Sequence, residues 1–322
     1  MSFLKKIKSN VENSKTAGYV VRKSKDAQLP GFRGIPLYDV VHFFITQVKT
    51  VGMTERASAI AFNFVMAIPP AIIFLFTLIP FMPISKEFEL ELYSLIRDVV
   101  PGEKDNSVLI GFLQDFINNP RNDLLSLGFL LSLYFSSNAI MGVMRSFDKN
   151  YIGFKKRKSI QKRLTAIRIT LVLYVFVFTT LLLFIGQGTV LNLLGIENKM
   201  IRTIIVNLRW VIIILLLFAS ISFIYRHAPA VHKKWRMINP GSILATGLTL
   251  VLTLGFSWWV GRFGNYNQLY GSIGTILILM ALIFVNSLVL LIGFELNVSI
   301  TSLKKIADER KDNPAGGGEK PV

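Results

Sequence analysis

The sequence contains no cysteine and only three histidines in 322 residues. Without cysteine the chain has no disulfide bonds, no thiol chemistry and no sulfur ligands for a metal. The histidines are at positions 42, 227 and 232, and this spacing is poor for placing His227 and His232 on one helical face. Cleavage of RNA needs clustered metal-binding carboxylates or paired histidines. We therefore predict that the protein is not an enzyme and has no catalytic residue, metal site or cofactor.

Charged residues and nucleotide-binding motifs are also scarce. Only 17% of the residues are charged and 52% are hydrophobic, whereas soluble domains carry about 25% charged residues. No glycine-rich loop ending in Gly-Lys-Ser/Thr occurs, so any transport is expected to be passive or ion-coupled. The basic stretch MSFLKKIKSN lacks the apolar segment that follows in a cleavable signal peptide. This composition is typical of an integral membrane protein.

Six apolar segments are long enough to cross a hydrocarbon core of about 30 Å. We predict an all-α integral membrane protein with six transmembrane helices and additional short amphipathic helices. The fifth span has a favourable start, with Asn239 as N-cap and Pro240 at the first helical position. The predicted spans lie at about 58–82, 124–144, 169–191, 204–225, 240–261 and 271–294.

The distribution of Lys and Arg predicts the orientation. The segments on one side of the predicted spans hold 28 of the 36 Lys and Arg residues, and those on the other side hold 8. Basic loops stay in the cytoplasm, so both termini are expected there. We predict three regions: a cytoplasmic segment 1–57 with an interfacial amphipathic helix at 37–49, a six-helix domain 58–301 with an acidic outer loop 83–123, and a disordered cytoplasmic tail 302–322.

The stretch FNFVMAIPPAIIFLF places Pro69 and Pro70 near the middle of the first span. Each proline removes a backbone donor and clashes with the preceding turn. Broken helices near the bilayer midplane recur in transport sites. We therefore expect this helix to be kinked or broken there and to line a cavity, with Asn63 as a replacement hydrogen-bond partner. A packing kink without a cavity is the alternative.

Polar residues inside spans are candidates for function because burying them in lipid is costly. Tyr134, Asn138 and Arg145 fall on one face of the second span. Asp148 follows Arg145 at i+3, so we expect the two side chains to pair. The alternative is an arginine that only fixes the orientation of the span and is neutralised by its neighbour.

Glu295 directly follows 24 residues without a charge. A carboxylate at the cytoplasmic end of a span is opposed by the helix dipole and therefore needs a partner. We consider Arg226, Arg145 and Arg168 for this role. The pair is either a structural salt bridge or part of a substrate or ion site, together with the nearby Asn297.

The predicted loop before the sixth span contains one cation, Arg262, and aromatic residues including Tyr270. Arg262 is a candidate for binding an anionic headgroup, and anchoring a helix end is the alternative. Tyr270 fits the aromatic belt found at membrane interfaces.

Three stretches carry a resemblance to a known family: ERASAIAFNFVMAIPPAIIFLFTLI, IYRHAPAVHKKWRMINPGSILAT and YGSIGTILILMALIFVNSLVLLIGFELNVSI. The last resembles the Tyr-Gly-Ser-x-Gly and Gly-x-Glu-Leu-Asn signatures of the YihY/virulence factor BrkB family of bacterial inner-membrane proteins, formerly labelled ribonuclease BN-like. Phe62 and Asn63 depart from the family's usual aromatic pair. The resemblance covers roughly residues 35–305. It implies an all-helical membrane protein whose activity is unsettled and has been suspected to involve envelope lipid or small-molecule transport.

We consider three functions. The first is a transporter or lipid-translocating protein with a central polar cavity. The second is a non-transporting envelope scaffold that docks partners on its acidic outer loop, and the least favoured is a membrane-bound nuclease. The expected partners are membrane lipids with anionic headgroups and a small-molecule or lipid substrate, without specific nucleic acid. A second copy of the chain, in a homo-oligomer, is a further partner that we consider.

Overall fold

The structure is a computed structural model, and its described elements are helices. It describes residues 23–24, 31–32, 34–50, 52–78, 93, 107, 110–111, 114–115, 122–148, 157–193, 199–231, 234–263 and 272–312. The main helices are α3 (Leu37–Thr50), α4 (Met53–Leu78), α7 (Asn122–Phe147), α8 (Ser159–Leu193), α9 (Lys199–His227), α10 (Pro240–Phe263) and α12 (Ser272–Asp312). Six of them, α4 to α12, are long and apolar enough to cross a membrane. The prediction of an all-α protein with six spans is confirmed.

Two helices extend well beyond their predicted spans. Helix α8 begins ten residues before its predicted span, at Ser159, and α12 continues through residue 312. Residues 302–312 are therefore helical rather than a disordered tail, and the rest of the tail lies outside the described residues. The extension contains two charge pairs at i,i+4 spacing, Lys304–Asp308 and Lys305–Glu309. Such pairs stabilise exposed helices by about 0.2–0.5 kcal/mol each.

The predicted break at Pro69 and Pro70 is absent, because α4 runs through both prolines without interruption. Proline fixes φ near the helical value, so it removes a hydrogen bond without forcing the helix to end. Asn63 does not replace that bond: its Nδ2 donates to the carbonyl of Ala59, 2.6 Å away and one turn earlier. Pro69 is exposed and Pro70 is half-buried. The kink itself stays a prediction.

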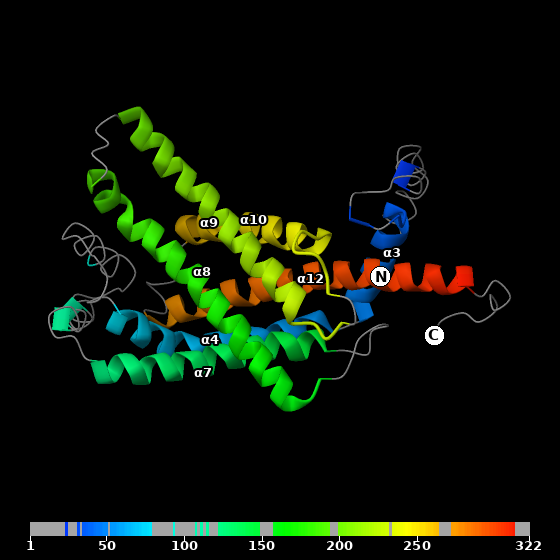
Figure 1. The fold of residues 1–322 in the computed structure, drawn as a ribbon, viewed down its shortest axis with the longest axis horizontal. Helices are drawn as coiled ribbons and strands as arrows, with labels where there is room; N and C mark the ends of the chain where they lie inside the picture. Colours follow the sequence, from blue (N-terminus) through cyan, green and yellow to red (C-terminus); the bar gives the residue numbers. More distant parts are fainter. Residues whose placement is uncertain are drawn as a thin grey trace.

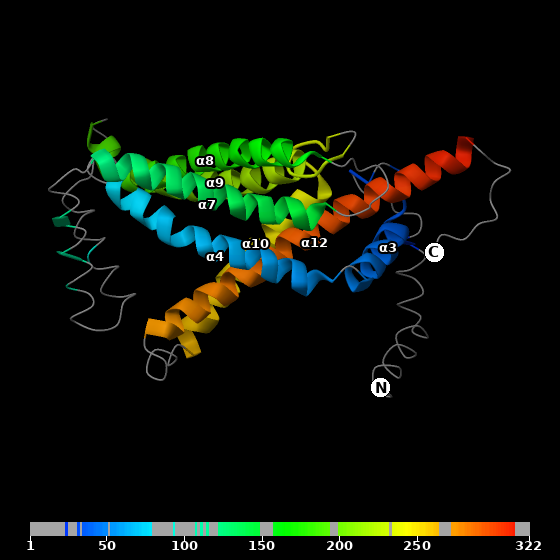
Figure 2. The same ribbon diagram turned by 90° about the horizontal axis from the view of Figure 1, so that it is seen from below.

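The six spanning helices converge at one end and diverge toward the other (Figures 1 and 2). Helix α4 packs along α7, α8 crosses α7 and lies beside α9, and α10 packs against α12. We call the convergent end, where α4 and α10 begin and α7 and α9 end, the closed end. The predicted amphipathic helix is confirmed as α3, which lies beyond the closed end and packs on α12 through Val40 and Ile300.

The core of the protein is concentrated at the closed end. Phe147 of α7 and Phe294 of α12 stack with ring centroids 3.8 Å apart, and the rings of Tyr225 and Trp235 pack against this pair. Aromatic pairs contribute about 0.5–1.5 kcal/mol beyond the area they bury. The buried share of each span is small, from 11% in α10 to 44% in α7. The remaining apolar surface is that expected for contact with lipid.

Helices α10 and α12 approach closely because both carry glycine at their crossing. A Cβ added to Gly293 would lie 2.5 Å from the carbonyl oxygen of Gly241 and 2.8 Å from the Cβ of Ala245. Small residues at such crossings let helix backbones approach each other. Glycine at position 293 also leaves room for the hydroxyl of Tyr225 of α9, which donates to the carbonyl of Leu290 of α12 at 2.6 Å.

We predict that Gly241→Ala destabilises the protein, because its new methyl group would overlap the backbone of α12. Overpacking of this kind costs about 1–3 kcal/mol. The matched control is Gly247→Ala on the same helix, where an added Cβ meets no described atom within 4 Å. Thermal unfolding in detergent, followed by tryptophan fluorescence, should show a lower midpoint for Gly241→Ala alone. Equal midpoints for the two variants would contradict the tight crossing.

Candidate functional site

A buried ion pair joins three helices at the closed end. Glu295 of α12 is fully buried and Arg56 of α4 is 8% exposed. Arg56 Nη1 donates to Glu295 Oε1 at 2.6 Å, and Nη2 donates to the carbonyl of Ser146, near the end of α7, at 2.5 Å. Removing one partner of such a pair leaves an uncompensated buried charge, which costs about 3–5 kcal/mol. The pair therefore ties α4, α7 and α12 together.

The prediction that Glu295 has a cationic partner is confirmed, but the three arginines considered from the sequence did not include Arg56. Arg56 had been placed in the N-terminal segment, two residues before the predicted first span. The sequence does indicate that Arg56 lies next to an apolar helical face. Met53, Ala57 and Ile60 are buried with it, at the i, i+4 and i+7 spacing of one helical face.

A second buried network contains Asn297, also a predicted site residue. Asn297 Nδ2 donates to Asn239 Oδ1 at 2.7 Å, and Asn297 Oδ1 accepts from the backbone N–H of Gly241 at 3.0 Å. Asn239 Oδ1 also accepts from the N–H of Ser242 at 2.8 Å, which confirms Asn239 as the N-cap of α10. Asn297 thus completes the cap from a neighbouring helix.

The polar face of α7 contacts α8 through Arg163, which was not among the predicted site residues. The guanidinium of Arg163 lies 4.6 Å from the centre of the Tyr134 ring, and its Nη1 donates to Asn138 Oδ1. Further along the same contact, the hydroxyl of Tyr174 bonds to those of Ser132 and Ser136. The predicted face of Tyr134 and Asn138 is therefore an interhelical contact, with Tyr134 itself 54% exposed.

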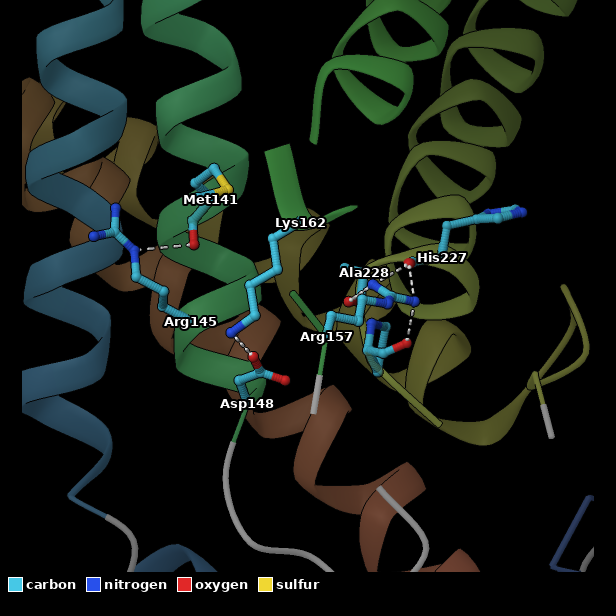
Figure 3. Close-up of polar contacts among 8 residues, drawn as sticks. Met141, Arg145, Asp148, Arg157, Lys162, His227 and Ala228 are labelled. Atoms are coloured by element: carbon cyan, nitrogen blue, oxygen red, sulfur yellow. Dashed lines mark hydrogen bonds and ion pairs between the residues drawn. The ribbon is translucent and has the colours of Figure 1, made fainter. Parts of the chain in front are cut away.

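The expected pair between Arg145 and Asp148 is not formed. The carboxylate of Asp148 pairs with Lys162 of α8, while Arg145 is exposed and its Nε donates to the carbonyl of Met141 at 3.3 Å (Figure 3). Helix α7 ends at Phe147, so Asp148 leaves the helix and no longer follows the i+3 geometry. The carboxylate is then free to reach the beginning of α8.

Arg157 lies beside Asp148 and binds the end of α9 (Figure 3). Its guanidinium donates to the carbonyls of His227, Ala228 and Pro229, at distances between 2.9 and 3.3 Å. These carbonyls follow the last helical turn, where a cation is favoured by the helix dipole. Burial lowers the pKa of the Arg157 guanidinium, and the negative charge of Asp148 acts in the opposite direction. Arg157 therefore caps α9 from the segment before α8.

A groove opens beside the network of Asn239 and Asn297, between the beginning of α10 and the last turns of α12. Its volume is about 1050 Å³. Three cations, Lys234, Arg236 and Lys304, and one carboxylate, Asp308, line it. Among the predicted site residues, Asn297 lines this groove. The described residues include no group of three or more His, Asp or Glu placed to hold a metal ion.

The other predicted site residues lie apart from these networks. Arg226 is half-buried in the last turn of α9, and Arg262 is exposed in the last turn of α10. Tyr270 lies outside the described residues. Asn63 packs against α7, where a Cβ added to Gly142 would lie 3.0 Å from its Nδ2. The structure thus distributes the predicted residues over several helix contacts, mostly near the closed end.

Six apolar helices held together at one end by buried polar networks define a multi-pass all-α membrane protein. The chain belongs to the virulence factor BrkB family, whose profile matches residues 44–317. It is 29% identical over 260 residues to a Bacillus subtilis protein provisionally named ribonuclease-like protein YfkH, covering 79% of this chain and 92% of the relative. It is 22% identical over 278 residues to a UPF0761 membrane protein of Mannheimia succiniciproducens, covering 82% and 90%. No solved structure matches the chain.

We predict that the Arg56–Glu295 pair is strongly coupled in its effect on stability. Arg56→Met and Glu295→Gln should each destabilise the protein by about 3–5 kcal/mol, since each leaves one buried charge without its counterion. The double variant should lose much less than the sum of the two. Thermal unfolding in detergent measures the cycle, and Arg145→Met is the control because Arg145 is exposed. Additive losses would show that the two charges are independent.

Proposed function

We propose that the protein is a passive or ion-coupled transporter of the bacterial inner membrane that moves a lipid or small molecule, and that the closed end is its cytoplasmic gate. The observation that carries this proposal is the buried Arg56–Glu295 pair at the point where the helices converge. Charges buried within a spanning bundle are rare and mark ion or substrate pathways.

The orientation of the gate rests on the distribution of basic residues. The closed end receives the loop between α7 and α8, the segment between α9 and α10, and the extension of α12. These are the segments in which Lys and Arg are concentrated. Because basic loops stay in the cytoplasm, the closed end is expected to face the cytoplasm, with both termini on that side.

The chemistry of the ion pair supports a gate more than a permanent seal. Well-packed apolar residues would hold the same helix ends at least as firmly, because a buried pair must offset the desolvation of both charges. Arg56 Nε is buried and has no hydrogen-bond partner among the described residues, so its donors are not all used. A bond between α4 and α12 that breaks when an ion or a substrate competes for Arg56 or Glu295 would couple opening to the binding of that ligand.

Two alternatives remain distinct from this proposal. A scaffold would use the acidic outer loop 83–123, which lies largely outside the described residues. A nuclease is suggested by the name of the Bacillus subtilis relative and by the former label of the family. Neither alternative requires the closed end to open. An experiment that detects opening therefore distinguishes the transporter from both.

We predict that a cysteine at Ala57, which is fully buried at the closed end, is modified slowly by a membrane-impermeant maleimide added to the cytoplasmic face. The chain has no other cysteine, so a single substitution reports one position. Adding Glu295→Gln should speed the modification by roughly tenfold or more, because weakening the gate by 1.4 kcal/mol changes its open population about tenfold.

The control for this measurement is Lys158→Cys, which is exposed just before α8 and should react at once in the same vesicles. Complete protection of the cysteine at position 57, with and without Glu295→Gln, would show a static closed end and favour the scaffold.

Translocation itself is measured in proteoliposomes that contain phosphatidylglycerol labelled with a nitrobenzoxadiazole group. Dithionite bleaches only the outer leaflet, so a passive lipid transporter should extend bleaching from roughly half of the label to nearly all of it. We expect this result for the wild type, and a faster approach to it for Glu295→Gln. Bleaching that stops at half in both would contradict lipid translocation.

A further inference from the structure

The groove beside α10 combines positive charge with exposed apolar surface at the level where a membrane span begins. Lys234 and Arg236 come from the segment before α10, and Lys304 comes from the α12 extension on the opposite wall. Asp308 is the one carboxylate of the lining, so the rim carries a net positive charge. Ile238 and Ile243, on either side of the first residue of α10, are 70% and 57% exposed.

We propose that this groove binds the phosphodiester headgroup of an anionic phospholipid from the leaflet that adjoins the closed end. Arg236 and Lys304 would contact the phosphate from opposite walls, and Ile238 and Ile243 would lie against the acyl chains. A guanidinium binds two phosphate oxygens at once, and an ammonium adds a point charge. The groove thus offers a charged half and an apolar half, as a lipid requires.

The cations of the groove are available for a ligand. Among the described residues, no carboxylate pairs with Lys234 or Arg236, and both are exposed. Lys304 does pair with Asp308 at 3.1 Å, but the two side chains are 39% and 51% exposed, so water and an incoming phosphate compete for the contact. The excess of cations in the groove favours an anionic headgroup over a zwitterionic one, because the zwitterionic headgroup carries no net negative charge.

The wall of the groove is held in place by its own hydrogen bonds. Asn297 and Asn239 use their side chains to bond each other and the first backbone N–H groups of α10. Trp235 is buried under the segment and its Nε1 donates to Thr301 of α12 at 3.1 Å. A rigid wall positions Arg236 relative to Lys304 before a ligand arrives, which reduces the entropy lost on binding.

The N-terminal segment of the chain is an unsuitable occupant. Gly31 lines the groove, which makes residues 1–30 an occupant to consider from their place in the sequence. Residues 1–30 carry seven Lys or Arg against two acidic residues, so their net charge has the same sign as that of the rim. An anionic lipid satisfies both the charge and the exposed isoleucines. This assignment goes beyond the proposed function, because binding at the groove does not require that the lipid be transported.

The test is native mass spectrometry of the full chain in detergent, with phosphatidylglycerol or phosphatidylcholine of identical acyl chains added in turn. We expect the wild type to retain phosphatidylglycerol preferentially. The double variant Arg236→Gln/Lys304→Gln should weaken that binding by roughly tenfold or more, since it removes two charge-assisted hydrogen bonds. Its thermal midpoint should stay near that of the wild type, because Arg236 is exposed and Lys304 is 39% exposed in its side chain.

Lys305→Gln is the matched control. Lys305 is the next residue of the same helix and makes the same kind of i,i+4 pair, with Glu309, but it does not line the groove. Equal weakening by Lys305→Gln, or equal retention of phosphatidylcholine, would overturn the assignment in favour of general surface charge. Displacement by water-soluble glycerol 3-phosphate would overturn it in favour of a soluble anion. None of these results depends on the translocation assay, so failure here is separate from failure of the proposed transport.

Discussion

The Arg56–Glu295 pair is the interaction on which the rest of the closed end depends. A carboxylate and a guanidinium are tolerated within a spanning bundle only when they meet, and the carbonyl of Ser146 completes the environment of the cation. This requirement fixes α4, α7 and α12 relative to one another. The aromatic stack of Phe147 and Phe294 lies in the same layer, so its geometry follows from where the charged pair holds the helix ends.

The basic residues near the closed end connect neighbouring helices. Arg157 caps α9, Lys162 binds Asp148, and Arg163 binds the polar face of α7. All three belong to the segment that the sequence indicates as a cytoplasmic loop. A loop that only had to stay on one side of the membrane would need charge without defined partners. Here the same charges connect α7, α8 and α9, which explains why α8 begins well before its apolar run.

The sequence predicts the six spans, because long apolar runs leave few other structures in a membrane. It also predicts the start of α10, because Asn239 and Pro240 are local signals that act within one turn. The sequence could not identify the partner of Glu295, because the pair joins residues 239 positions apart and depends on how three helices cross. The Arg145–Asp148 expectation was wrong for a related reason: it assumed that α7 continues past Phe147, whereas the chain turns there and brings Asp148 to Lys162.

One short segment of α12 contacts nearly every other element at the closed end. Gly293 meets α10, Phe294 stacks on α7 and Glu295 binds α4. Two residues later Asn297 completes the cap of α10, and one turn further Ile300 packs with α3.

These contacts point in different directions around a single rigid helix, so α12 cannot rotate or slide without breaking several of them together. Packed interfaces with alternative arrangements switch between them rather than deforming gradually. The gate that we propose would therefore open in a concerted step, in which the loss of the ion pair releases the glycine crossing and the aromatic stack at once. Under that proposal, a substrate or ion that competes for Glu295 alone would be sufficient to shift the whole end between two states.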